Sequence, residues 1–372
     1  MTQKNKTTKK NKTTKKNERK FMKEYTQSPI FFNRNRVYRV YTGGWLMEQF
    51  LNQTGEDNNF PEEWIASTVH AANNVNAKKD DGLSKIENTE ITLKELGENY
   101  PREMYGKATG LGILVKYLDS AIRLPLQAHP DKAYAKKYFN SLYGKTEMWL
   151  ILATREGANI CFGFNNEITK EEFSAIVEES KEEKNIMDKY VNKVYVQPGE
   201  VYLIPAKAVH AIGAGCLILE IQEPTDFTLS PEYWCGDHLL SNQEMYMGLP
   251  KDTALECFDY SMFGKECIKQ ARKTPKLFRE NSDVKIEHLI TSEDTPCFSV
   301  VRYTVTKKVK LVKGAVIYIV TKGEGKIEGE SYQREVKQGD YFFLPFEARD
   351  KFTAVSNKDK PLELIECIPP EE

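Results

Sequence analysis

The chain has 372 residues, and its 53 Lys and Arg against 54 Asp and Glu give a formal net charge of -1. Residues 1–21 hold nine basic residues and one acidic residue, which leaves a body with 44 basic and 53 acidic residues. That balance excludes a nucleic-acid-binding surface spread over the fold, because binding to phosphates needs clustered Lys and Arg. No apolar run approaches the roughly 20 residues that span a bilayer, so no membrane segment is predicted.

The first segment is repetitive, since residues 5–10 and 11–16 both read NKTTKK. A charged repeat of this kind has no apolar surface to bury, so residues 1–24 are predicted to form a disordered basic tail. No apolar segment follows the basic residues, which excludes a secretory signal. The tail is interpreted as dispensable, with Met22 as an alternative start; nonspecific contact with polyanions is the other interpretation.

The cysteines are odd in number, widely spaced and without a CxxC pair. This pattern is typical of reduced thiols in a cytoplasmic protein and predicts no zinc-thiolate site. The seven positions are Cys161, Cys216, Cys235, Cys257, Cys267, Cys297 and Cys367.

Short strands and turns with helices between them are predicted from Phe31 onward. The sequence TLKEL at residues 92–96 predicts a helical turn that ends at Gly97. A longer helix is predicted over Thr169–Lys189, because a threonine cap, acids in the first turn and apolar residues on one face occur together. Residues 241–272 are also predicted helical. The predicted strands are 148–153, 193–196, 201–205, 297–305, 309–311, 315–321, 341–345, 351–355 and 362–368.

An internal repeat links the two halves of the chain. Gly199–His210 and Gly339–Asp350 share a glycine, five residues, a proline and four residues before the last position. Upstream, the apolar runs Trp149–Thr154 and Val316–Thr321 match and both end in Thr. The sequence therefore predicts two β modules of one kind.

Polar residues of the kind that bind metals gather in the first copy. Gln127 and His129 alternate, so on a strand both side chains face the same side. Glu147 opens the strand after a turn, and His210 ends the first copy of the repeat. One amide oxygen, two imidazoles and a carboxylate form a mixed nitrogen and oxygen set that zinc accepts.

The second copy lacks this set. Aligning the two copies matches Glu147 with Gly314 and His210 with Asp350, and no histidine follows His288. The second module is therefore predicted to be metal-free, with a structural or dimerising role.

These motifs resemble type I phosphomannose isomerases, also called mannose-6-phosphate isomerases, of the cupin superfamily. The resemblance runs from about Asn35 to the C-terminus and implies a mainly β fold with helical insertions and two cupin modules, which are jelly-roll (double-stranded β-helix) barrels. It places a catalytic metal-binding cupin at residues 25–240, a helical connection at 241–283 and a second cupin at 284–372. The matching segments are 61–67, 127–131, 144–147, 198–200, 205–213 and 220–226.

The resemblance implies a zinc-dependent aldose–ketose isomerase that interconverts mannose-6-phosphate and fructose-6-phosphate through a cis-enediol. One zinc ion per chain is expected on Gln127, His129, Glu147 and His210. Such chemistry also needs a base that reaches two neighbouring carbons and a group that stabilises oxyanion charge. The family residues in these positions are Lys145, Glu220 and Asp226. The expected partner is a sugar phosphate, with no nucleic acid or membrane, and the chain is expected to be a monomer or homodimer.

Two residues depart from the family pattern. Ser230 stands where the family has an arginine that serves catalysis and phosphate binding, and Pro125 stands where many members have a serine. Replacement cations considered from the sequence are Lys132, Lys207 and Arg123. The alternatives are an isomerase-like cupin acting on another sugar, phosphorylated or not, and a catalytically silent sugar-binding cupin that keeps zinc for structure.

Overall fold

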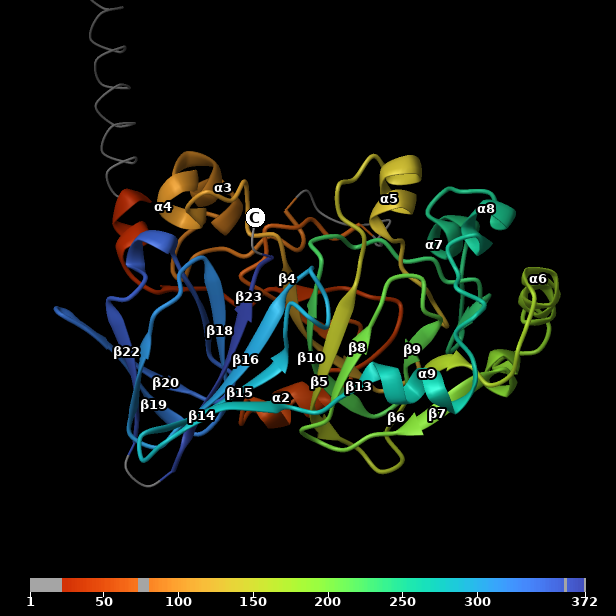
Figure 1. The fold of residues 1–372 in the computed structure, drawn as a ribbon. Helices are drawn as coiled ribbons and strands as arrows, with labels where there is room; N and C mark the ends of the chain where they lie inside the picture. Colours follow the sequence, from red (N-terminus) through yellow and green to blue (C-terminus); the bar gives the residue numbers. More distant parts are fainter. Residues whose placement is uncertain (1–21, 73–79, 358–359, 371–372) are drawn as a thin grey trace, which may run out of the picture.

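The computed structural model describes residues 22–72, 80–357 and 360–370. The predicted tail lies outside this part of the chain, except for its last three residues. These three are helical and Met22 is buried, so the prediction of disorder is wrong for residues 22–24. The chain forms two β barrels that stand side by side, the first toward the right and the second toward the left of Figure 1.

The first barrel combines a seven-stranded antiparallel sheet with a three-stranded sheet. In spatial order the larger sheet holds β13 (Arg272–Lys273), β8 (Val201–Ile204), β5 (Glu147–Thr154), β10 (Cys216–Gln222), β4 (Leu114–Ser120), β3 (Glu62–Ile65) and β2 (Arg36–Val37). The smaller sheet holds β7 (Val191–Tyr195), β6 (Asn159–Phe164) and β9 (His210–Ile212). A separate hairpin joins β11 (Trp234–Cys235) to β12 (His238–Leu239).

The second barrel repeats this plan with a seven-stranded and a four-stranded sheet. The larger sheet holds β1 (Ile30–Phe31), β21 (Tyr341–Leu344), β18 (Val316–Lys322), β23 (Leu362–Ile368), β16 (Ser299–Val305), β15 (Val284–Ile290) and β14 (Lys276–Glu280). The smaller sheet holds β17 (Lys308–Leu311), β22 (Phe352–Ser356), β19 (Glu324–Gly329) and β20 (Tyr332–Lys337). Because β1 pairs with β21, the start of the described chain is built into the second barrel, which the sequence pattern did not indicate.

The core between the barrels explains why the central strands are apolar on both faces. Met148 and Leu150 of β5 point away from the first barrel's interior and share one buried cluster with Ile317 of β18 and Ile365 of β23. Their neighbours Trp149 and Ile151 fill the first barrel instead. Each fully buried aliphatic side chain of this kind stabilises the fold by about 1.5–3 kcal/mol, so the two barrels form one packed unit.

Short helices connect and cover the strands. They are α2 (Trp45–Phe50), α3 (Leu93–Asn99), α4 (Pro101–Tyr105), α5 (Lys132–Phe139), α6 (Lys170–Glu179), α7 (Asn242–Tyr246), α8 (Lys251–Leu255) and α9 (Gly264–Ala271), with 3-10 turns η1 (Tyr25–Gln27), η2 (Ile186–Lys189) and η3 (Phe346–Ala348). In Figure 1, α5, α7 and α8 lie along the upper edge of the first barrel.

The predicted helix over residues 169–189 is too long. Thr169 caps α6 through a capping box with Glu172, as predicted, but the helix ends at Glu179. The Ser180 hydroxyl donates to the Val177 carbonyl at 2.7 Å, and Asn185 adopts a left-handed conformation with φ 64°. Residues 181–185 carry no apolar side chain, so nothing holds another helical turn against the barrel.

The register of the sheets corrects the alignment of the two copies. Glu147 pairs with Ile204 in the first barrel, and Val316 pairs with Leu344 in the second. Ile204 and Leu344 occupy the same position of the repeat, so the counterpart of Glu147 is Val316 and not Gly314. The predicted alignment was wrong by two residues, a shift that keeps the same face of a strand and that apolar patterning cannot detect.

Candidate active site

Three buried side chains in the first barrel bring their ligand atoms within 4.8 Å of one another: His129, Glu147 and His210. Glu147 is the first residue of β5 and His210 the first of β9, while His129 lies just before α5. The Nε2 atom of His129 lies 3.1 Å from Glu147 Oε2, and that of His210 lies 3.4 Å from Glu147 Oε1. The structure therefore unites three of the four predicted metal ligands.

Backbone carbonyls fix the orientation of both imidazoles. The Nδ1 of His129 lies 2.9 Å from the Phe227 carbonyl oxygen, and that of His210 lies 2.9 Å from the Ala208 carbonyl oxygen. A carbonyl can only accept, so each Nδ1 carries the proton and each Nε2 keeps a lone pair that faces Glu147. Burial, helped by the Lys145 charge, lowers the pKa of His129 to about 3, and burial also lowers the pKa of His210. Both rings are neutral at physiological pH, as metal ligation requires.

Unsatisfied acceptors show that this cluster suits a cation. Among the described residues, Glu147 Oε1 and His210 Nε2 are buried and accept no hydrogen bond. A buried carboxylate without donors is costly, and a divalent ion removes that cost. The Lys145 ammonium already lies beside this cluster, 2.8 Å from His129 Nε2 and 3.1 Å from Glu147 Oε2. Two neutral imidazoles and a carboxylate fit zinc, the metal that the sequence predicted.

Gln127, the fourth predicted ligand, lies beside the cluster. Its backbone N–H donates to the His210 carbonyl, and the His210 N–H donates to the Gln127 carbonyl, both at 2.9 Å. Its side chain is buried and lines a cavity of about 100 Å³ that Lys145 also lines. The structure places Gln127 next to His210, and its role as a ligand stays a prediction.

Glu220 lies at the centre of β10 and faces the same cavity. The Trp149 indole N–H donates to its Oε1 at 3.1 Å, while the Lys116 ammonium lies 3.4 Å from its Oε2. Burial and the nearby charge of Glu147 raise the pKa of Glu220 to about 7. A carboxyl with that pKa can both take up and release a proton near neutral pH.

Asp226 also lines the cavity but is held on several sides. The Arg39 guanidinium donates to both carboxylate oxygens, at 3.2 and 3.3 Å, and the Ala72 backbone N–H donates to Oδ2 at 2.9 Å. Both oxygens of this carboxylate are therefore already occupied by donors. Of the two base candidates left open by the sequence, Glu220 is therefore the better suited, and Asp226 orients Arg39.

Sequence comparison points to one group of enzymes. The chain is 28% identical to the mannose-6-phosphate isomerase ManA of Bacillus subtilis over 327 residues, which are 86% of this chain and 94% of that relative. It is 29% identical to the mannose-6-phosphate isomerase of Streptococcus mutans over 324 residues, 85% of this chain and 92% of that one. The chain resembles the mannose-6-phosphate isomerases. No family model matches it.

Solved structures of mannose-6-phosphate isomerases share the fold. The crystal structure of the enzyme from Bacillus subtilis aligns with a TM-score of 0.73 at 23% identity, covering 92% of this chain and 99% of that one. A variant of phosphomannose isomerase from Salmonella typhimurium aligns with a TM-score of 0.67 at 12% identity, covering 92% and 100%. The predicted fold, mainly β with helical insertions and two cupin modules, is thus confirmed.

Ser230, the departure from the mannose-6-phosphate isomerase pattern, is buried and lines the cavity together with three cationic residues, Arg39, Lys116 and Lys145. The Nη1 of Arg39 is buried and donates no hydrogen bond to any described residue. The guanidinium also donates to Glu62, from Nε to Oε1 at 2.8 Å. Three cationic side chains therefore line the cavity with Ser230, and each is paired with a buried carboxylate.

The replacement cations considered from the sequence lie elsewhere. Arg123 is paired with Glu232 at 2.6 Å and Asp188 at 2.9 Å, and the Lys132 side chain is 56% exposed. Neither these two nor Lys207 is among the residues that line the cavity. The sequence missed Arg39 and Lys116, although a lysine in the middle of the otherwise apolar strand at 114–118 was a usable signal, because a fully buried lysine needs a partner.

All seven cysteines are buried free thiols. In the described part of the chain, no helix has the length and apolar character needed to cross a membrane.

Proposed function

We propose that this protein is a zinc-dependent mannose-6-phosphate isomerase that acts through a cis-enediol. The observation that carries the proposal is the buried His129–Glu147–His210 cluster, which contacts Lys145. Lys145 in turn lines a cavity together with Glu220 and two further cationic side chains. The similarity to mannose-6-phosphate isomerases over more than four-fifths of the chain agrees with it.

The chemistry needs one base that serves two carbons. In the direction from aldose to ketose, a base removes the proton from C2, a proton is gained at O1 to give the cis-enediol, and the proton from O2 is then lost while C1 is protonated. Glu220 is assigned as the base that moves the carbon-bound proton. Its raised pKa suits this exchange, and the Trp149 N–H holds one carboxyl oxygen so that the other remains available.

Zinc, held by Gln127, His129, Glu147 and His210, would act as a Lewis acid toward the sugar oxygens. Lys145 is the side chain best placed to assist there, because its ammonium already lies beside His129 and Glu147. It would stabilise negative charge that develops on O1 and O2 during the reaction. Its burial, with 4% of the residue exposed, strengthens that effect by keeping water away.

We assign to Arg39 the role of the family arginine that Ser230 replaces. Arg39 lines the cavity with Ser230, and its Nε and Nη2 are fixed by Glu62 and Asp226, so the guanidinium is preorganised. A planar fork of this kind binds phosphate or a developing oxyanion better than a flexible ammonium. Because the cavity itself is only about 100 Å³, the phosphate of a bound sugar would lie toward its mouth.

A coupled assay on the purified full chain tests the proposal, with mannose-6-phosphate and free mannose as alternative substrates and with or without a chelator. The expected result is turnover of mannose-6-phosphate that the chelator abolishes and zinc restores. Turnover of free mannose at a higher kcat/KM would instead identify an isomerase for an unphosphorylated sugar. No turnover of either substrate by zinc-loaded protein would identify a silent binder and reject the proposal.

We further propose a cytoplasmic location, supported by the seven buried free thiols. The chain is proposed to act as a monomer or homodimer on a small sugar phosphate.

A further inference from the structure

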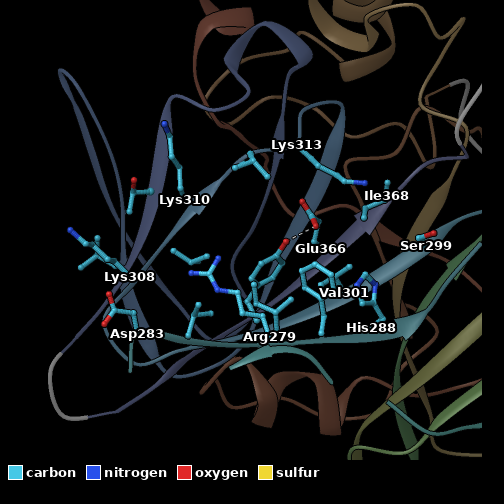
Figure 2. A pocket seen from close by; sticks show the side chains of 18 of the residues that line it. Arg279, Asp283, His288, Ser299, Val301, Lys308, Lys310, Lys313, Glu366 and Ile368 are labelled. Carbon is cyan, nitrogen blue, oxygen red and sulfur yellow. Dashed lines mark hydrogen bonds between the residues drawn. The ribbon is translucent and has the colours of Figure 1, made fainter. Parts of the chain in front are cut away.

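The second barrel encloses a large cavity that the proposed function does not use. Its volume is about 1040 Å³, against about 100 Å³ for the cavity at the candidate active site. Aliphatic side chains from several strands line it, and Figure 2 labels Val301 and Ile368 among them. They are Val284, Ile286, Val301, Val309, Val355 and Ile368. A hollow of this size and depth is in the range of small-molecule sites.

A buried carboxyl group forms part of the floor of this cavity. Glu366 is 1% exposed, and each of its oxygens accepts one hydrogen bond, Oε2 from the Tyr303 hydroxyl at 2.8 Å and Oε1 from the Tyr318 hydroxyl at 2.5 Å. Each carboxyl oxygen has a second lone pair. The floor is therefore a fixed acceptor that can bind the hydroxyl groups of a ligand.

Glu366 is the counterpart of Glu220 in the first barrel. Glu220 pairs with Trp149 in the register of β10 and β5, and Glu366 pairs with Tyr318 in the register of β23 and β18. In both barrels the aromatic partner donates a hydrogen bond to the carboxyl group. The second barrel thus lacks the metal ligands but keeps the inward-facing glutamate, in a more spacious hollow.

Charged side chains of both signs also line the cavity, and they include Arg279, Lys308, Lys310, Asp283, Glu328 and Glu330. Figure 2 shows Arg279 extending from β14 into the hollow, while Lys308 and Lys310 lie toward the left of the view with their ammonium groups pointing outward. Arg279 forms no ion pair with any described residue, whereas Lys310 is paired with Asp350 at 3.0 Å on the exposed surface. An unpaired guanidinium aimed into a hollow attracts an anion, while the buried Glu366 keeps that anion away from the floor.

We propose that this cavity is a second small-molecule site, for a hydroxylated organic anion of the sugar-phosphate class. The hydroxyl groups of the ligand face Glu366 and its two tyrosines, the carbon skeleton packs against the valine walls, and the anionic group contacts Arg279. An apolar ligand would leave the buried carboxyl unused, and a bare anion would contact only one end of the cavity. The proposal does not depend on the proposed function, because it uses none of the metal-site residues.

Hydrogen–deuterium exchange of the full-length protein, with mannose-6-phosphate as the probe, tests this site locally. The peptides to follow cover β14 and β17, which line the cavity and are partly exposed. We expect mannose-6-phosphate to slow their exchange severalfold, and inorganic phosphate and free mannose at the same concentration to do so much less. Equal protection by inorganic phosphate or by free mannose, or no protection by mannose-6-phosphate, would overturn the ligand class or the site.

Two variants sharpen the test. Arg279→Ser changes an exposed residue on an edge strand and should fold normally, and Glu366→Gln keeps the shape of the floor. Each should weaken mannose-6-phosphate binding in the second barrel about tenfold, as the loss of a charge-assisted hydrogen bond predicts. Turnover in the first barrel, measured on the same samples, should not change for Arg279→Ser. Protection of β14 and β17 that is unchanged in the Arg279→Ser variant would reject the proposal even if Glu366→Gln failed to fold.

Discussion

The Nζ atom of Lys145 lies 2.8 Å from His129 Nε2, so a buried ammonium shares the lone pair that a metal ion would use. Lys145 is therefore both an aid to catalysis and a competitor for the metal site. This relationship separates metal binding from turnover in a way that can be measured.

Lys145→Ala should leave zinc binding intact or tighten it, because the competing cation is lost from beside Glu147. The kcat should fall about 100-fold or more, since one stabilising group for the oxyanion is removed. Calorimetric zinc titration and the coupled assay on the same preparation check both effects. Loss of zinc binding together with activity would show that Lys145 supports the metal site and would contradict this assignment.

Arg39→Lys should raise KM for mannose-6-phosphate and lower kcat/KM by about 10- to 100-fold, because an ammonium cannot contact Glu62, Asp226 and the substrate in the same planar arrangement. The matched control is Lys132→Ala, which removes an exposed cation outside the cavity and should leave kinetics unchanged. Thermal denaturation of both variants identifies any loss from misfolding. Normal kinetics for Arg39→Lys with impaired kinetics for Lys132→Ala would reverse the assignment of the replacement charge.

The dependence of kcat/KM on pH should report the titration of Glu220. The base must be deprotonated to act, so activity should be low in acid, rise with pH and level off above a pKa of about 7. Bound zinc would offset the Glu147 charge that helps to raise this pKa, so the inflection of the zinc-loaded enzyme should lie at or below 7. Glu220→Gln should abolish turnover at every pH while keeping zinc. An unchanged acidic limb in an active Glu220→Gln variant would exclude Glu220 as the base.

Substitutions at corresponding positions of the two barrels should differ in their effect on zinc binding and turnover. His210→Ala should abolish zinc binding and turnover, whereas Asp350→Ala, at the corresponding place in the second barrel, should change neither. Asp350 is exposed and contacts Lys310, so its loss should cost at most about 1 kcal/mol of stability. Zinc content by atomic emission and the coupled assay provide the readouts. Zinc loss in Asp350→Ala would mean that the metal lies in the other barrel.

Spacing made the metal cluster predictable from the sequence. Gln127 and His129 alternate on an extended segment, the repeated Gly–Pro motif ends at His210, and the family resemblance linked these residues to Glu147. Arg39 and Lys116 were missed because their partners, Asp226 and Glu220, lie more than 100 residues away in the chain. The pairing of β4 with β10, for example, places Lys116 opposite Glu220.

Hydrophobic patterns in the sequence have limits that also explain the errors in the predicted fold. The capping residue Thr169 made the start of α6 predictable, but the sequence held no comparable signal for its end at Glu179. The match of Glu147 to Gly314 failed because a strand shifted by two residues presents the same alternation. The large cavity of the second barrel could not be predicted from the sequence either. Nothing in the sequence separates Glu366 from the many other acidic residues, and its role depends on the contacts with Tyr303 and Tyr318 that only the fold creates.

The central claim is that the buried His129–Glu147–His210 cluster holds the metal that isomerisation of mannose-6-phosphate requires. The most direct measurement titrates zinc into chelator-treated protein while the conversion of mannose-6-phosphate to fructose-6-phosphate is followed. The account predicts no activity in the metal-free protein and a linear rise that saturates at one zinc ion per chain. Full activity without metal, or zinc bound at one ion per chain with no isomerisation, would contradict it.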